Sequence, residues 1–301
     1  MSAAEDVPGQ SRGRAGIGGV AVVAGAAVII ALSFVMARLT YDAGSNPLTV
    51  IALRYPVVAL IVGALVGLRG GSLALARRDL PAGYGVGLVY FVGTGCYLAS
   101  ILYLPVSLAV LVFYTYPLMT VAFESALGRR LPRLLDVVAF LVAFGGLALA
   151  LQVSFAGLDP RGIAFALVGA VGASAAFVWT GRALPHVNTL VLSFHMSVCG
   201  TLVAALAVLA SGALALPATG AAGWGALAAT IICFAVAFIG MFTGVRMIGA
   251  LRTSMVMNLE PIATIGLAVL LLGESLTLQQ LVGAALVLGA VALAQRPAAA
   301  R

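Results

Sequence analysis

The chain has 301 residues, of which 63% are hydrophobic and 8% are charged, whereas a typical soluble domain carries roughly 25% charged residues. This composition excludes an ordinary water-soluble protein. The net charge of +7 comes from Arg residues scattered between apolar runs, which excludes a basic nucleic-acid-binding face. The three Cys residues lie inside apolar runs without the spacing of a metal site or a disulfide framework, so we expect neither.

Apolar runs of about 20 residues, each long enough to cross about 30 Å of hydrocarbon, follow one another along the chain. Residues 1–16 are polar, and we expect a disordered cytoplasmic segment there. The first apolar run has no convincing cleavage site, so we interpret it as a retained helix. Turn signals such as Asn46-Pro47 and Asp159-Pro160 fall between runs. We predict ten transmembrane helices, at 17–37, 48–68, 81–103, 106–127, 134–153, 162–181, 189–210, 222–244, 250–271 and 279–295.

The arginines predict the orientation, because cytoplasmic loops are enriched in basic residues. With the N-terminus inside, ten spans place thirteen of the 16 Arg residues in cytoplasmic segments and two, Arg38 and Arg161, outside; Arg54 falls within a span. One span more or fewer would reverse the later loops and remove this bias. We therefore predict a multi-pass protein of a bacterial cytoplasmic (inner) membrane, with both termini, including the tail 296–301, in the cytoplasm.

The two halves of the chain match when one is shifted by 144 residues. Pro117 then meets Pro261, and Arg38 meets Arg182. Each copy holds five helices, an odd number, so the second copy enters the membrane in the opposite orientation, as in many secondary transporters. The expected fold is an all-α membrane protein of two inverted five-helix repeats, at 17–153 and 162–295, joined by a periplasmic linker at 154–161.

The matched prolines are the sharpest local feature, because each lies inside a predicted helix, the fourth and the ninth. A proline there removes a backbone hydrogen bond and frees a carbonyl four residues earlier, which for Pro261 is the carbonyl of Met257. In lipid, such a carbonyl needs a partner or a hydrated cavity. Two interpretations are open: Pro117 and Pro261 are structural kinks, or they shape and gate a central cavity.

Polar residues within the spans are the other candidates. A carboxylate in a span costs several kcal/mol unless it is paired, protonated or hydrated, so Glu260, with Asn258 beside it, is expected to face a cavity. Glu260 would bind a cationic substrate group, carry a proton or anchor neighbouring helices. Arg54 would hold a substrate carboxylate or form an ion pair. His195 is either a proton carrier or a packing residue.

Four tyrosines, Tyr90, Tyr97, Tyr114 and Tyr116, fall deep in the third and fourth predicted helices. They would line a pocket for aromatic or amphipathic solutes, or pack between helices. The sequence has no P-loop, zinc-protease motif, nucleophile elbow or acidic cluster of the kind used in polyprenyl chemistry. We therefore expect no enzymatic activity, no catalytic residue, no cofactor and no metal.

Motifs in the second half resemble the EamA family of the drug/metabolite transporter superfamily: Arg246-Met-Ile-Gly-Ala, Asn258-Leu-Glu-Pro261 and Leu272-Gly-Glu274-Ser-Leu. The first half carries the matching Tyr116-Pro117, but has Gly128-Arg-Arg130 where the family often repeats Gly-Glu. The resemblance covers residues 17–295. It implies a ten-helix carrier with both termini inside and a central cavity between the halves, and known members commonly export amino acids, other metabolites or drugs.

The function expected from these features is a secondary transporter that exports small metabolites, amino acids or related compounds, by alternating access. One alternative is a multidrug or organic-cation proton antiporter in which Glu260 exchanges protons for cations. A second alternative is a non-transporting membrane scaffold. The expected partners are a small-molecule substrate and the lipid bilayer, with protons as a candidate coupling ion, no nucleic acid, and a monomeric or homodimeric state.

Overall fold

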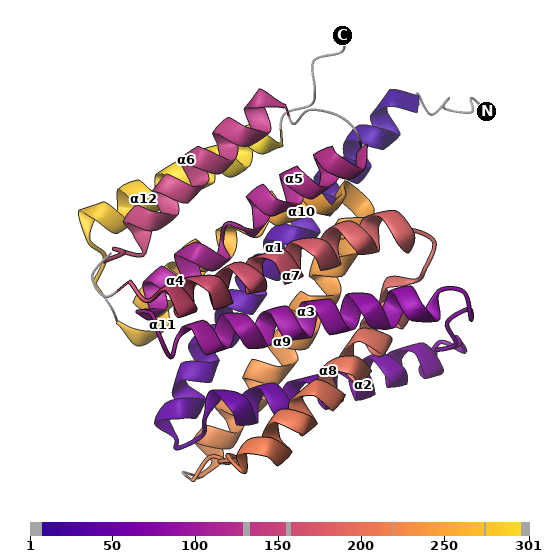
Figure 1. The fold of residues 1–301 in the computed structure, drawn as a ribbon, viewed down its shortest axis with the longest axis vertical. Coiled ribbons are helices and arrows are strands. Elements are labelled where there is room, and N and C mark those ends of the chain that lie inside the picture. The colour runs from indigo at the N-terminus through magenta and orange to yellow at the C-terminus, as the bar shows by residue number, and fades with distance from the viewer. Residues whose placement is uncertain (1–7, 129–132, 155–157, 219, 274, 296–301) are drawn as a thin grey trace, which may run out of the picture.

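The fold is all α-helical in the residues that the computed structural model describes, which are 8–128, 133–154, 158–218, 220–273 and 275–295, with side chains from residue 17 (Figure 1). Parts of the predicted terminal segments, of the 154–161 linker and of the motifs at Arg130 and Glu274 therefore lie outside the described residues. The helices are α1 (Pro8–Asp42), α2 (Pro47–Leu68), α3 (Leu80–Ser100), α4 (Val106–Phe113), α5 (Tyr116–Gly128), α6 (Leu134–Ala150), α7 (Pro160–Ala183), α8 (Thr189–Ser211), α9 (Gly220–Ile248), α10 (Ala250–Val256), α11 (Leu259–Leu272) and α12 (Leu278–Ala294).

Ten spans result, because α4 with α5 and α10 with α11 each form one broken span. In the described part of the chain, eight spans are long and apolar enough to cross a membrane, and α6 and α12 are apolar helices of 17 residues, near the lower limit for spanning. The prediction of ten helices is confirmed. The largest differences are at α1, which begins at Pro8 and not at residue 17, and at α9, which extends beyond 222–244 at both ends.

The packing of the helices has the symmetry of an inverted repeat. The main partner of α1 is α9, and the equivalent pair in the other half, α7 and α3, is also in close contact. Helix α2 packs against α8, its equivalent in the second repeat, and α6 packs against its own equivalent, α12. These two pairs lie at opposite edges of the bundle (Figure 1). A two-fold axis in the membrane plane produces this arrangement.

The loops confirm which helix ends share a face. Ser45, after α1, donates to the carbonyl of Ala215, before α9, at 2.8 Å. At the opposite face, His186 after α7 meets Asp79 before α3, with 3.0 Å between Nε2 and Oδ2. We call the face with Ser45 and Ala215 the open face and the face with His186 and Asp79 the closed face. The start of α1 and the end of α12 both lie at the closed face (Figure 1).

Side-chain caps mark the start of two helices, α2 and α7, at the open face. Asn46 accepts a hydrogen bond from the Thr49 N–H at 2.8 Å and caps α2, whose first residue is a proline. Asp159 caps α7 in the same way, and hydrogen bonds from Arg161 hold the pKa of its carboxyl below the usual value. These caps satisfy amide groups that would otherwise be unpaired where the chain enters the bilayer.

Glycines set the closest helix contacts, as expected where helices pack in lipid. A Cβ atom added at Gly146 of α6 would lie 2.7 Å from the Leu286 Cβ and 2.8 Å from the Gly283 carbonyl oxygen of α12. The neighbouring Gly145 has no atom within 4 Å of such a position and is exposed on the outer surface. The two glycines therefore form a matched pair for a test of this contact.

We expect Gly146→Val to destabilise the protein by about 1–3 kcal/mol, because the added atoms force the backbones of α6 and α12 apart. Gly145→Val, with the same chemical change one residue away, is expected to have almost no effect. Thermal unfolding of the two purified variants in one detergent measures the difference. Equal melting temperatures would show that α6 and α12 are not packed as described.

Candidate functional site

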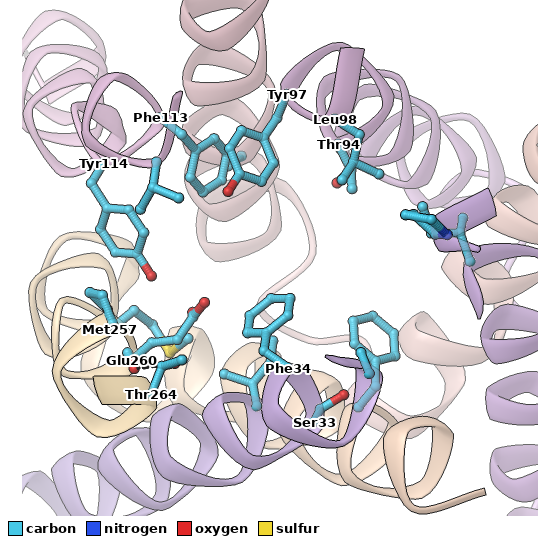
Figure 2. Close-up of a pocket in the computed structure, with 18 of the residues that line it drawn as sticks. Ser33, Phe34, Thr94, Tyr97, Leu98, Phe113, Tyr114, Met257, Glu260 and Thr264 are labelled. Atoms are coloured by element: carbon cyan, nitrogen blue, oxygen red, sulfur yellow. Dashed lines mark hydrogen bonds between the residues drawn. The ribbon is translucent and has the colours of Figure 1, made fainter. Parts of the chain in front are cut away.

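A cavity of about 560 Å³ lies between the two repeats (Figure 2). This volume falls within the range of about 300–1,000 Å³ that is usual for small-molecule sites. Its wall comes from α1 to α5 of the first repeat and from α7, α9 and α11 of the second. The cavity therefore lies where two inverted repeats place a transport site.

The cavity is one-sided. Its lining reaches the helix ends at the open face, at Tyr41, Pro47 and Ile101. In the other direction it ends at Tyr90 in the middle of α3, and at Phe177 and Met241 of the second repeat, which lie six and seven residues before the ends of α7 and α9. A solute of moderate size therefore has a path to the open face but not to the closed face.

An aromatic layer forms the floor of the cavity. The rings of Tyr90 and Phe242 have their centroids 5.8 Å apart, and so do those of Phe177 and Phe242. The ring of Tyr116 lies 5.9 Å from that of Phe177. Tyr90 and Tyr116 belong to the first repeat, and the two phenylalanines belong to the second, so this layer joins the repeats.

Polar contacts between the repeats continue toward the closed face. Thr120 donates to the Ser174 hydroxyl at 3.0 Å, which joins α5 to α7. Near the surface, Arg182 of α7 forms an ion pair with Glu124 of α5, with 2.7 Å between Nη2 and Oε2. This side of the cavity is thus closed by several layers.

Helix breaks carry the central polar residue into the cavity. Between α10 and α11 the chain leaves the helical pattern at Met257 and Asn258, and Pro261 lies in the first turn of α11, where its missing N–H costs little. Pro117 has the equivalent place at the start of α5. The prolines thus mark where a helix stops and restarts, and the Met257 carbonyl accepts from the Glu260 N–H at 3.0 Å and does not need the cavity.

Glu260 is half-buried in the first turn of α11, and its carboxylate points into the open space (Figure 2). The Tyr114 hydroxyl points toward it and interacts with it. No Arg, Lys or His nitrogen among the described residues lies within ion-pair distance of this carboxylate. The N-terminal end of α11 favours a negative charge at this place.

Arg54 enters the cavity wall from α2. Its guanidinium carbon lies 4.1 Å from the centre of the Phe234 ring, and its Nη2 donates to the Tyr55 hydroxyl at 2.9 Å. Its Nε is buried and has no hydrogen-bond partner. Within the described part of the chain, no carboxylate forms an ion pair with it. The protein thus holds this guanidinium in place, and no described carboxylate pairs with its charge.

The tyrosines that stood out in the sequence all line the cavity, namely Tyr90, Tyr97, Tyr114 and Tyr116, and Pro261 does so too. The structure also brings Phe34 and Phe234 into the wall, which the sequence analysis did not identify. Phe234 was detectable, because it is the counterpart of Tyr90 at the 144-residue offset.

Three of the candidate residues are not part of this lining. Asn258 is buried at the helix break and donates to the Met255 carbonyl at 3.1 Å. Pro117 is buried in α5 behind the wall. His195 lies near the closed face, where its ring nitrogens contact the Tyr84 hydroxyl at 3.1 Å and the Leu73 carbonyl at 2.9 Å. Its hydrogen bonds thus connect α8 to α3 and to the segment after α2.

Inverted five-span repeats around a one-sided cavity define a membrane protein of the carrier type. The sequence model of the EamA-like transporter family matches residues 17–152 and 160–295, and the chain belongs to this family of drug/metabolite transporters. A solved crystal structure is similar at 23% identity with a TM-score of 0.74, over 91% of this chain and 96% of that one, which supports the fold alone. A search of curated proteins finds no match.

Proposed function

We propose that the protein is a secondary transporter that exports small metabolites, preferably amino acids or related compounds, across a bacterial cytoplasmic membrane by alternating access. The observation that carries the proposal is the one-sided cavity between the repeats, whose wall contains Glu260 and Arg54, neither of which has an ion-pair partner among the described residues. Membership of a transporter family supports solute transport over a scaffold or an enzyme.

The distribution of arginine supports an orientation with the closed face in the cytoplasm. Two arginines, Arg38 and Arg161, lie near the open face. With this orientation the structure corresponds to an outward-facing state, and both termini are cytoplasmic. The arginines near the closed face, among the residues whose side chains the structure describes, are Arg69, Arg77, Arg78, Arg133, Arg182, Arg246 and Arg252.

The test of this function is solute flux in proteoliposomes that contain the purified chain. The panel contains amino acids, short amino-acid derivatives and organic cations, each measured with and without a pH gradient. Accumulation of at least one amino-acid-like solute above protein-free liposomes is the expected result. Absence of flux for the whole panel would remove the proposal.

We expect Glu260→Gln to lower this flux on the order of 10- to 100-fold, because the amide loses the charge that contacts the solute or its coupling ion. The amount of protein in the membrane should not change. Asp42→Asn is the matched control, since Asp42 is exposed at the end of α1 and does not line the cavity. Wild-type flux in Glu260→Gln would exclude Glu260 from the transport site.

One observation favours a second candidate function, the exchange of organic cations for protons. Glu260 faces an aromatic-lined cavity without an ion-pair partner in the described residues, and aromatic rings attract cations. Under this alternative, transport of a lipophilic cation would require Glu260, would stop when the pH gradient collapses, and would not need Arg54.

A further inference from the structure

We propose that the cavity selects elongated zwitterions, with an anionic group at Arg54, a cationic group at Glu260 and an apolar spacer between them. This inference rests on the proposed transport function and specifies its substrate class. It goes beyond single α-amino acids, because the two charged side chains do not lie together.

The two charges lie at different depths in the cavity. Arg54 is seven residues from the start of α2 at the open face, which corresponds to about 10 Å along the helix. Glu260 is twelve residues from the end of α11 at the same face, or about 18 Å. The backbone positions of the two residues therefore differ by about 8 Å in depth along the helices.

They also project from different parts of the wall. Helices α2 and α11 are not among the helix pairs that pack together in the described structure. Tyr90, in the middle of α3, lines the same cavity as both charged groups. A ligand that contacts both charges must therefore extend across the cavity.

Each charge is oriented by its neighbours, and the part of the chain that the structure describes supplies no ion-pair partner for either one. Stacking on Phe234 and the hydrogen bond from Arg54 to the Tyr55 hydroxyl fix the guanidinium, which suits a carboxylate. The Glu260 carboxylate interacts with the Tyr114 hydroxyl and has room for an ammonium group in the cavity. A cation alone would leave Arg54 unpaired, and an anion alone would leave Glu260 unpaired.

The wall between the two charges is suited to an apolar chain or ring. The rings of Tyr97 and Phe113 pack with their centroids 4.4 Å apart and form one side (Figure 2). The hydroxyls of Thr94 and Thr264 donate to backbone carbonyls of their own helices, so they add little demand for polar ligand groups. A spacer of methylene groups would bury apolar surface here.

The test measures binding to the purified full chain in lipid nanodiscs. The probes are 6-aminohexanoate, glycine as a short zwitterion, and hexanoate and hexylamine, each of which lacks one charge. We expect 6-aminohexanoate to bind more tightly than each of the others, on the order of 10- to 100-fold for each lost charged contact.

The variants assign the two ends of the ligand. In the Arg54→Gln variant we expect hexylamine and 6-aminohexanoate to bind with equal affinity. In the Glu260→Gln variant we expect hexanoate and 6-aminohexanoate to bind with equal affinity. Arg54→Met repeats the first measurement if Arg54→Gln proves unstable. The control is Arg161→Gln. Arg161 pairs with Asp159 at the surface, so this variant should keep the wild-type order of affinities.

Three results would overturn the inference: glycine binding as tightly as 6-aminohexanoate, hexylamine binding as tightly in the wild type, or no binding of any probe at millimolar concentration. Proteoliposome flux distinguishes failure of this inference from failure of the proposed transport function. If other solutes of the panel are still transported, only the elongated zwitterion is wrong, whereas if no solute is transported, the proposed function fails as well.

Discussion

Oxidation of a Gly181→Cys/Val245→Cys variant is expected to abolish flux in proteoliposomes. The two positions face each other between α7 and α9 below the aromatic floor, and a Cβ atom at Gly181 would lie 3.5 Å from Cγ1 of Val245. Cγ1 of Val245 takes the place that the sulfur of a cysteine would have, so this separation is short enough for a disulfide to form between the two positions. A covalent bond there holds the closed face shut, and a carrier that cannot open to both sides cannot complete its cycle.

The background for this variant replaces the native cysteines, Cys96, Cys199 and Cys233, with alanine. Flux should return after reduction, and each single-cysteine variant should transport solute under oxidising conditions. Because the cavity remains accessible from the open face, the cross-linked protein should still bind its ligand. Undiminished flux in fully cross-linked protein would show that α7 and α9 do not separate during transport.

The ten spans and the inverted repeat were predictable from the sequence because lipid imposes a simple rule. Each span must be apolar over about 20 residues and must satisfy its own backbone hydrogen bonds. The ends of α1 and α9 were less predictable, since these helices continue past the apolar run. Beyond the hydrocarbon, helix length depends on local caps and neighbours and not on hydropathy.

The candidate site was predictable in part, for the same reason. Glu260 and Arg54 stood out because a charge inside an apolar run is costly, and both line the cavity. His195 stood out equally, but its ring contacts Tyr84 and a backbone carbonyl near the closed face. The difference lies in which neighbours satisfy each polar group, and no pattern within a single span contains that information.

The repeat offset identifies where the opposite gate should form. Shifted by 144 residues, Gly181 corresponds to Ala37 of α1, and Val245 corresponds to Ile101, which follows α3. Both Ala37 and Ile101 line the cavity near the open face. Helices α7 and α9 pack together, whereas the equivalent pair, α1 and α3, stands on different sides of the cavity (Figure 2). In the other state of the carrier, we expect α1 and α3 to meet as α7 and α9 do here.

We therefore expect an Ala37→Cys/Ile101→Cys variant to cross-link only after the closed face has opened. Cross-linking should stop flux and should shield a cavity cysteine at Thr264→Cys from an impermeant maleimide added at the open face. In a protein that carries both cysteine pairs, either disulfide should prevent the other, because the two gates close in alternate states. Simultaneous formation of both disulfides in one molecule would mean that the repeats do not exchange conformations, and alternating access through this cavity would be untenable.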